Sequence, residues 1–291
     1  MTQAGRHAVL ILAHTQPQLL RLLLEAVDSP HIDVFLHVDD ASVLTSHRFH
    51  TRRSALHVTT GKAAWGGFSL VRAEFRLLEM AVRADSYDYL HLISGQDLPL
   101  VTPAELRERM AGRREQFIGR TPARDGAADW KIRYWHPFAD NRRYRTSLVM
   151  KGTRRASVAA QRVMHVDRVS PMDLQPRHGS QWFSITAAFA HWLLDRRQWA
   201  QRAFQHAITS DELLLPTMWA TLSPPFELSS EQDQNLRWIN WDPLREPGPR
   251  TITMADVPVV RSHQERCLFA RKFDLVTDPD AVAAVMERLS R

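Results

Sequence analysis

The sequence is almost without cysteine, since Cys267 is the only one among 291 residues. An intramolecular disulfide is therefore excluded, and so is a structural zinc site built from several thiolates. A chain so poor in cysteine is typical of a reducing compartment. Hydrophobic residues make up 44% and charged residues 24%, which is the balance of a globular protein with a sizeable core.

Long hydrophobic runs are also missing. Near the N-terminus the longest apolar run extends from Ala8 to Ala13, which is too short to span a membrane. No signal-peptide cleavage pattern follows this run. We therefore expect an unanchored protein that is located in the cytoplasm, with at most a peripheral contact at the inner face of the membrane.

The usual metal and nucleotide motifs are absent as well. The sequence has no HExxH, CxxC or EF-hand pattern, and neither GxxxxGK[ST] nor GxGxxG follows the first predicted strand. The one Asp-x-Asp, at Asp278–Asp280, begins the last predicted helix, where its carboxylates are expected to cap that helix. We predict no bound metal and no cofactor, so that a bound diphosphate would have to be neutralised by side-chain cations.

Lysine is scarce, with only four residues, so the formal net charge of +6 comes almost entirely from arginine. Arginine suits phosphate recognition because its planar fork donates two hydrogen bonds at once. A modest basic excess spread over the whole chain gives little support to nucleic-acid binding, and no nucleic-acid partner is expected. The densest basic stretch, residues 142–155, is interpreted either as a solvated loop and helix face or as a surface for an acceptor or an anionic lipid.

The first hundred residues alternate between strand and helix patterns. Strands are predicted at 7–13, 32–38, 56–60 and 89–93, helices at 16–27 and 68–82, and a capped helix beginning at Thr102, Pro103 and Glu105. Further helices are predicted at 154–169, 187–197, 211–222 and 280–289, strands at 181–185 and 237–241, and irregular structure over 243–266. This order indicates one α/β domain built on a mostly parallel sheet with helices on both faces.

Ligands bind beyond the carboxyl ends of the strands in such sheets. Asp39 ends one predicted strand, and Asp97 follows another inside Ser94-Gly95-Gln96-Asp97-Leu98-Pro99. Each of these carboxylates is either a ligand contact or part of an ordinary turn. Glu212, in the first turn of a helix expected to be capped by Ser210, either complements the helix dipole or serves as a general base.

Two cations near the C-terminus, Arg250 and Lys272, are further candidates. Lys272 lies in the stretch Phe269-Ala270-Arg271-Lys272-Phe273. A cation flanked by phenylalanines is partly desolvated, which strengthens its attraction for an anion such as a diphosphate. The alternative interpretation is an ordinary amphipathic turn.

Nine short stretches, in order along residues 7–275, resemble the core-2/I-branching β-1,6-N-acetylglucosaminyltransferases, a family that includes the peptide O-xylosyltransferases. They are Val9–His14, Leu36–Asp39, Trp65-Gly66-Gly67, Tyr89–Leu100 with its Ser-Gly-x-Asp-x-Pro-Leu, Gly179–Phe183, Asp211-Glu212, Arg237–Trp241, Pro249-Arg250-Thr251 and Leu268–Asp274. The resemblance implies a GT-A fold, which is a Rossmann-like α/β domain. It also implies an inverting, metal-independent transfer from a UDP-sugar, with N-acetylglucosamine or xylose as the sugar.

The resemblance also implies roles for single residues. Glu212 is similar to the base that deprotonates the acceptor hydroxyl, and Arg250 and Lys272 are similar to the cations that take the place of a metal at the diphosphate. Asp39 resembles the aspartate that contacts uridine. Trp65 and Asp97 are expected on the donor side of the site.

The substrate-binding residues implied by the resemblance are Trp241, Ser180 and Trp182. Trp241 resembles a tryptophan that packs on the acceptor sugar, and a tryptophan face suits the apolar C–H side of a sugar ring. Within the single domain, residues 1–119 are expected to bind the nucleotide and residues 120–275 to hold the acceptor and the catalytic machinery. Residues 276–291 are expected to form a C-terminal helix.

We expect the protein to depart from the animal members of the family by having no N-terminal anchor. It has a single cysteine, and residues 120–180 match those members poorly. For a cytoplasmic enzyme we expect a glycan or a lipid-linked acceptor. Two other functions stay open on the sequence alone. One is a metal-dependent nucleotide-sugar transferase, and the other is a basic protein that binds nucleic acid or a membrane surface through residues 142–155.

Overall fold

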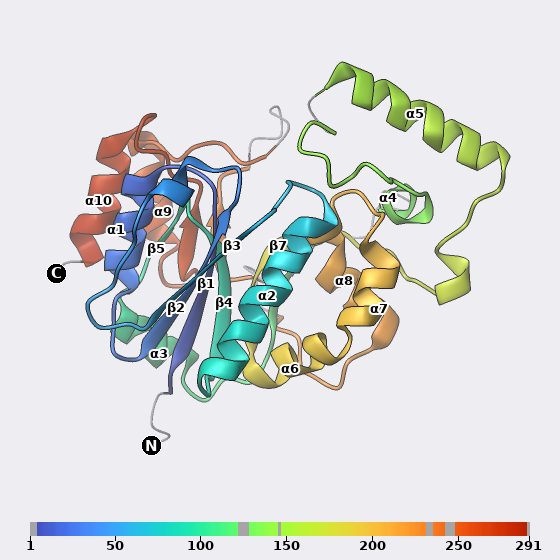
Figure 1. Ribbon diagram of the computed structural model, residues 1–291. Coiled ribbons are helices and arrows are strands. Elements are labelled where there is room, and N and C mark those ends of the chain that lie inside the picture. The colour runs from blue at the N-terminus through green and yellow to red at the C-terminus, as the bar shows by residue number, and fades with distance from the viewer. Residues whose placement is uncertain (1–4, 122–127, 145–146, 231–234, 242–247, 290–291) are drawn as a thin grey trace.

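The computed structural model describes residues 5–121, 128–144, 147–230, 235–241 and 248–289. Helices cover both faces of a six-stranded sheet with the order β3-β2-β1-β4-β7-β6 (Figure 1). The parallel strands are β1 (His7–Ala13), β2 (Ile32–Asp39), β3 (Leu56–Gly61) and β4 (Tyr89–Ser94). The antiparallel pairings of the sheet involve β7 (Gly179–Thr186), which lies between β4 and β6 (Phe117–Arg120). The predicted α/β class with a mostly parallel sheet is confirmed.

Strand β1 shows why the sheet needs helices on both faces. All seven of its residues are buried. Ala8, Leu10 and Leu12 enter one hydrophobic core, while Val9, Ile11 and Ala13 enter the other. Because successive side chains of a strand point to opposite faces, a strand that is apolar throughout has to be covered twice.

The helices divide between these two cores (Figure 1). One face is covered by α2 (Phe68–Ala84), α6 (Ala187–Asp195), α7 (Arg197–Phe204) and α8 (Ser210–Leu222). The other face is covered by α1 (Pro17–Val27), α3 (Pro103–Met110), α9 (Val257–Ser262) and α10 (Pro279–Leu289). The carboxyl ends of the parallel strands stay uncovered by these two layers and are available for a site.

A second sheet of three short strands packs into the core on the α1 side. Its order is β5-β9-β8, in which β5 (Asp97–Pro99) is antiparallel to β9 (Phe269–Arg271) and β8 (Arg237–Ile239) is parallel to β9. Leu98, Phe269 and Ala270 bury their side chains in that core. Of these short strands, β8 was predicted, although as the longer stretch 237–241. β5 and β9 were missed, as was β6, because three or four residues carry little periodicity.

Most predicted elements of the first hundred residues are confirmed, with bounds that shift by one or two residues. The start of α3 agrees in detail. Thr102 Oγ1 accepts a hydrogen bond from the Glu105 amide at 3.3 Å, and the Glu105 carboxylate accepts one from the Thr102 amide at 2.7 Å. This reciprocal capping satisfies two N–H groups that the helix itself leaves unpaired.

Other predictions need correction. Helix α5 covers Leu148–Val163 rather than 154–169, because Ser147 accepts from the Met150 amide at its start and His165 ends it with a φ of 52°. The single helix predicted at 187–197 is two helices, α6 and α7. Part of the stretch 243–266, predicted to be irregular, forms α9, while residues 242–247 lie outside the described residues.

Candidate active site

The carboxyl ends of the parallel strands open into a large cleft of about 1370 Å³. The predicted site residues that line it are Asp39, Trp65, Ser180, Trp182, Glu212, Trp241 and Lys272. The other two predicted residues, Asp97 and Arg250, do not line the cleft but are adjacent in sequence to Gln96 and Pro249, which do. Segments from both ends of the chain thus meet at one place, as the rule for open α/β sheets predicts.

Asp39 ends β2 and is held by a cation that comes from much later in the chain. Arg142 forms an ion pair with Asp39, and its Nη2 atom also lies 2.6 Å from Asp40 Oδ1. Asp39 Oδ1 accepts a further hydrogen bond from the Ala41 amide at 3.2 Å. A ligand that contacts Asp39 would therefore share this carboxylate with Arg142.

Glu212 lies in the first turn of α8. The helix follows Thr209, whose φ is 55°, and Ser210 is its first residue rather than its cap. Ser210 Oγ donates instead to the carbonyl oxygens of Phe204 and Ala207, at 3.0 and 3.1 Å. The prediction of Ser210 as the N-cap was therefore wrong, because the hydroxyl finds buried carbonyl partners at the end of α7.

The carboxylate of Glu212 is oriented by His178, which was not among the predicted site residues. His178 Nε2 lies 2.9 Å from Glu212 Oε2, and the two side chains are 34% and 31% exposed. The carboxylate is thus both fixed in direction and reachable from the cleft, as a general base requires. The sequence offered one signal for His178, which is its position directly before the Gly179–Phe183 stretch.

Two consecutive cations, Arg271 and Lys272, line the cleft at the end of β9. The Arg271 guanidinium stacks on the ring of Trp182 at 4.1 Å, and its Nε lies 3.7 Å from Asp97 Oδ1. Its side chain is 12% exposed, yet Nε and Nη1 have no hydrogen-bond partner among the described residues. Burial lowers the pKa of this guanidinium, and the Asp97 carboxylate opposes that shift. Unsatisfied donors on a buried cation beside a cleft favour an anionic ligand.

Asp97 and Arg250 are already engaged with other groups. Asp97 is fully buried and accepts hydrogen bonds from Ser94 Oγ at 2.5 Å and from the Ser94 amide at 3.0 Å. It therefore closes its own turn and places a negative charge behind Arg271. The guanidinium of Arg250 forms an ion pair with Asp256 and is partly exposed. A diphosphate would have to compete with Asp256 for this cation.

Two aromatic residues of the site are partly exposed to solvent. Trp65 is 49% exposed and Trp241 is 62% exposed. Trp65 precedes Gly66, which has a φ of 74° and whose carbonyl accepts a hydrogen bond from the Thr209 amide at 2.7 Å. At Gly67 a Cβ atom would lie 2.8 Å from the Ala139 carbonyl oxygen, which is closer than packing allows. Gly66 thus lets the Trp65 turn pack against the start of α8, and Gly67 lets it pack against Ala139.

The cleft carries an excess of positive charge. Among its described lining residues, Arg120, Lys131, Arg142, Arg237, Arg271 and Lys272 outnumber Asp39, Asp211 and Glu212. Within the part of the chain that the structure describes, no three His, Cys, Asp or Glu side chains group together as metal ligands. A basic, partly enclosed cleft suits a ligand with several negative charges.

The sequence matches the family model of the Core-2/I-Branching enzyme over residues 8–261. The chain belongs to this family. The Core-2/I-Branching enzymes are glycosyltransferases, so the protein is a transferase. Membership of this class implies in general a nucleotide-sugar donor and a glycan acceptor. Its six-stranded α/β fold is consistent with the GT-A-like fold of the family. A search among curated proteins found no match.

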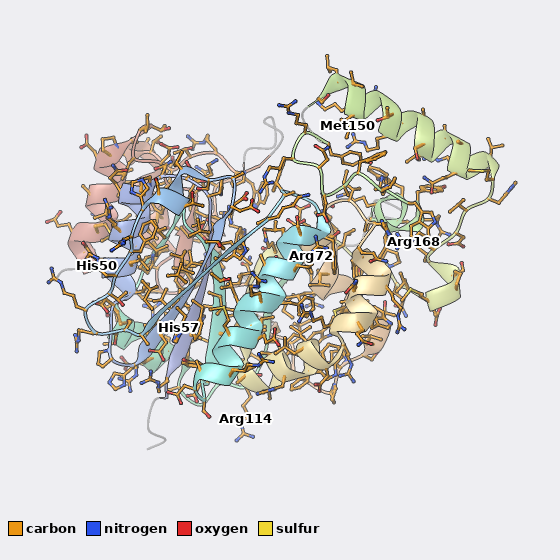
Figure 2. The ribbon with its side chains drawn as sticks, viewed as in Figure 1. His50, His57, Arg72, Arg114, Met150 and Arg168 are labelled. Atoms are coloured by element: carbon orange, nitrogen blue, oxygen red, sulfur yellow. The ribbon has the colours of Figure 1, made fainter. Side chains whose placement is uncertain are left out.

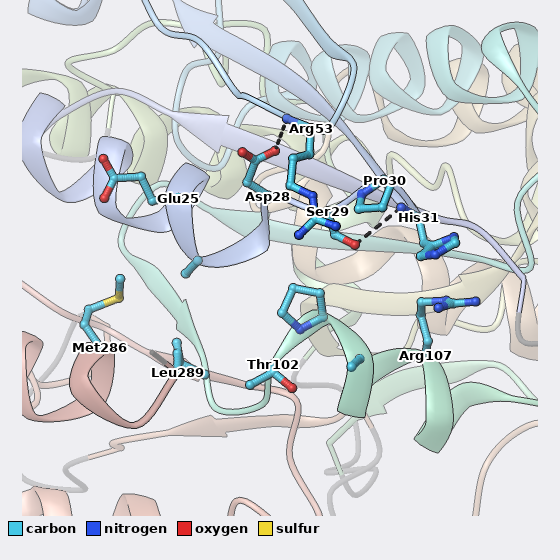
Figure 3. A pocket seen from close by; sticks show the side chains of 13 residues that line it. Glu25, Asp28, Ser29, Pro30, His31, Arg53, Thr102, Arg107, Met286 and Leu289 are labelled. Atoms are coloured by element: carbon cyan, nitrogen blue, oxygen red, sulfur yellow. Dashed lines mark hydrogen bonds between the residues drawn. The ribbon is translucent and has the colours of Figure 1, made fainter. Parts of the chain in front are cut away.

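A smaller hollow of about 470 Å³ in this Core-2/I-Branching enzyme lies between α1, α3 and α10 (Figure 3). Its central carboxylate, Asp28, accepts hydrogen bonds from the amides of Arg52, Arg53 and Ser54 at 2.8 to 2.9 Å. These bonds fasten the segment before β3 to the end of α1. The polar groups there are explained by the fold, and none of the predicted site residues lines this hollow.

Two buried carboxyl groups, Glu74 and Asp211, lie near Glu212. Glu74 of α2 accepts a hydrogen bond from Gln181 Nε2 at 2.7 Å, and Asp211 is 4% exposed beside Glu212. Burial, and next the charge of Asp211, raise the pKa of Glu74 well above its usual value. Glu74 therefore keeps its proton in the folded protein at pH values where the unfolded chain has lost it.

We predict that Glu74→Gln stabilises the protein increasingly as pH rises. In the wild type, Glu74 contributes fully to stability below about pH 4.3, the pKa of a glutamate in the unfolded chain. Above that pH the free energy of unfolding falls by up to about 1.4 kcal/mol per pH unit until the raised pKa of Glu74 in the folded protein is reached. Glutamine has no proton to lose and retains an acceptor for Gln181. Thermal unfolding between about pH 5 and about pH 8 should show a widening gap in Tm between variant and wild type. The exposed Glu25→Gln serves as control, and a gap independent of pH would contradict the assignment.

Proposed function

We propose that the protein is an inverting glycosyltransferase that transfers a sugar from a UDP-sugar to an acceptor hydroxyl without a divalent metal. One observation carries the proposal: a single cleft holds an oriented carboxylate, Glu212, and two cations, Arg271 and Lys272. The carboxylate suits activation of a nucleophile, and the cations suit a departing diphosphate. N-acetylglucosamine and xylose are the proposed sugars, and a glycan or a lipid-linked precursor is the proposed acceptor.

In the proposed reaction, Glu212 takes the proton from the acceptor hydroxyl as the oxygen attacks the anomeric carbon. His178 orients the Glu212 carboxylate through the 2.9 Å contact between Nε2 and Oε2. A single displacement forms the new glycosidic bond on one face of the carbon while the bond to the diphosphate breaks on the opposite face. The configuration is therefore inverted.

The leaving UDP gains negative charge as the bond breaks. Lys272 and Arg271 are proposed to stabilise this charge, since preorganised cations in a partly buried site act without reorganising. Arg271 is favoured by its unsatisfied donors, and Arg250 would join when the diphosphate displaces Asp256. This arrangement would do the work that a metal ion does in other nucleotide-sugar transferases.

The remaining predicted residues are proposed to position the two substrates. Asp39, beside Arg142, would accept hydrogen bonds from the uridine, and Trp65 would border the donor. Asp97 would act indirectly through Arg271. On the acceptor side, the exposed ring of Trp241 would cover a sugar face, with Ser180 and Trp182 on the adjoining wall. A UDP-release assay with UDP-N-acetylglucosamine, UDP-xylose, UDP-glucose and UDP-galactose tests the proposal, and no UDP-sugar hydrolysis or transfer would contradict it.

We predict that Glu212→Gln lowers turnover by roughly 10²–10⁴-fold, because the amide cannot accept the proton of the acceptor hydroxyl. UDP affinity should remain close to that of the wild type, since the leaving group lies on the opposite side of the reacting carbon. Single-turnover kinetics and UDP titration measure the two effects separately. The matched control is Glu108→Gln on the exposed side of α3, and near-normal turnover of Glu212→Gln would remove this residue from the role of base.

For His178 we predict a loss of turnover in His178→Ala that His178→Gln partly restores. A glutamine side chain can place an N–H donor near the position of Nε2 and so continue to orient Glu212. A purely structural role would predict equal losses of Tm and activity in both variants. Activity and thermal unfolding should therefore be measured together, and equal turnover in the two variants would exclude orientation of Glu212 by this hydrogen bond.

Lys272→Ala should weaken binding of UDP about ten- to a hundred-fold, the range expected for losing a hydrogen bond between charged groups. Uridine, which carries no phosphate, should bind with unchanged affinity. Calorimetric titration of both ligands gives the comparison, and Lys151→Ala, a lysine outside the cleft, provides the control. Equal losses for UDP and uridine would show that Lys272 does not face the diphosphate.

A further inference from the structure

Helix α5 (Leu148–Val163) turns an apolar stripe away from the rest of the molecule. Large apolar side chains near both helix ends are strongly exposed, namely Leu148 at 83%, Val149 at 74%, Val163 at 79% and Met164 at 65%. The exposed surface between them carries the small residues Gly152, Ala156, Ala159 and Ala160. Spacings of three, four and seven place most of these residues along one side of the helix.

The opposite side of α5 makes polar contacts with the body. Gln161 accepts a hydrogen bond from the Trp135 amide at 2.7 Å and donates one to the Trp135 carbonyl at 2.9 Å. The guanidinium of Arg154 lies over the Tyr144 ring at 5.6 Å. An amphipathic helix ordinarily buries its apolar stripe against its own domain, so these contacts leave the stripe of α5 for a partner.

The segment after α5 is anchored firmly, so the orientation of the helix is fixed by the fold. Arg168, labelled beside α4 (Asp129–Arg133) in Figure 2, donates to the carbonyl oxygens of Ile132 and Ala203, each at 3.0 Å. Figure 1 shows α5 as the outermost element on its side of the molecule. Its apolar stripe is therefore presented outward on a supported helix.

The charged side chains between Asp140 and Asp167, a stretch that includes α5, are all basic. Residues 141–166, which we call the basic arm, contain seven arginine and lysine residues and no aspartate or glutamate. Lys151, Arg155 and Arg162 lie along one flank of the apolar stripe by their helical spacing. Arg145 also belongs to the basic arm but lies outside the described residues.

We propose that the basic arm docks on the surface of an anionic lipid bilayer. The lipid interface accepts apolar side chains below the headgroups and attracts cations at the headgroup phosphates, so it satisfies both features of α5. A nucleic acid or an acidic glycan would pair with the arginines but would leave Leu148 and Val163 in water. The described residues contain no helix with the length and hydrophobicity of a transmembrane span.

Docking would also position the cleft. Arg142, near the start of the basic arm, lines the cleft and pairs with Asp39 and Asp40. A bilayer in contact with the basic arm would therefore lie near the Arg142 rim of the cleft, on the side of the proposed uridine contact. This consequence rests on the proposed function, whereas the docking itself is independent of the reaction.

The test is flotation of the full-length protein with vesicles of phosphatidylcholine and phosphatidylglycerol, compared with vesicles of phosphatidylcholine alone. The protein should float with the anionic vesicles and stay behind with the neutral ones, and high salt should weaken the binding. Absence of flotation with anionic vesicles at low salt would overturn the proposal, whatever the outcome of the UDP-sugar assays.

Paired variants separate the two contributions. Leu148→Ser/Val163→Ser should weaken binding to anionic vesicles by roughly tenfold or more, and Arg155→Gln/Arg162→Gln should weaken it by roughly five-fold per charge. Matched controls are Val259→Ser/Val276→Ser, which alters exposed valines elsewhere, and Arg52→Gln/Arg114→Gln, which removes exposed charges outside the arm. The controls should bind as the wild type does. An apolar double variant that binds like the wild type, together with binding to an oligonucleotide, would identify a polyanion surface instead.

A second readout does not depend on comparing affinities. Because the single native cysteine, Cys267, is buried, Val149→Cys can be labelled selectively with an environment-sensitive fluorophore. Its emission should shift to the blue when anionic vesicles are added, while the same label in Val276→Cys should not respond. An unchanged emission at position 149 on vesicles that bind the protein would show that the apolar stripe does not enter the bilayer.

Discussion

The active-site cleft depends on the antiparallel pairing of β5 with β9. This pairing places the Asp97 strand beside the Arg271 strand, and the amide of Phe273 donates to the Gln96 carbonyl at 2.8 Å. Two segments that are distant in sequence, β5 and β9, are thus held together beyond the end of β4. Phe269 and Ala270 of β9 are buried in the hydrophobic core. The position of Arg271 and Lys272, which follow them and line the cleft, is therefore fixed by the packing of β9. A loop would hold the same cations less firmly.

This arrangement buries the guanidinium groups of two arginines, which is unfavourable unless they are paired or hydrogen-bonded. Arg237 is buried next to Arg271, and burial lowers the pKa of its guanidinium to about 9. Arg237 is stabilised by donating to Ser184 Oγ at 2.7 Å and to the carbonyl oxygens of Phe183 and Leu92, at 2.6 and 3.1 Å. Among the described residues, Arg271 contacts Asp97 Oδ1 at 3.7 Å and the Trp182 ring, and its Nε and Nη1 atoms have no hydrogen-bond partner. In Arg237 both Nη atoms donate hydrogen bonds and Nε lacks a partner. This difference favours Arg271, with its neighbour Lys272, as the group that would bind an anionic ligand.

The sequence predicted those features that rest on local patterns, as the success with β1 and with the Thr102 capping box demonstrates. Periodicity carries little information about strands of three residues, so β5 and β9 were missed, and the long-range contact of Arg271 with Trp182 could not be foreseen. His178 was missed because its role depends on a long-range contact with Glu212. The clustering of most predicted site residues followed from the strand-end rule and from the family resemblance together, while their chemical roles stay predictions.

The central claim is that side-chain cations, and no metal, hold the diphosphate of a UDP donor. Calorimetric titration of UDP in the presence of EDTA, repeated with manganese in place of EDTA, tests it most directly. We expect one UDP to bind per chain with the same affinity under both conditions. Binding that requires manganese would contradict the account, because Arg271 and Lys272 would then be insufficient and a metal would have to complete the site.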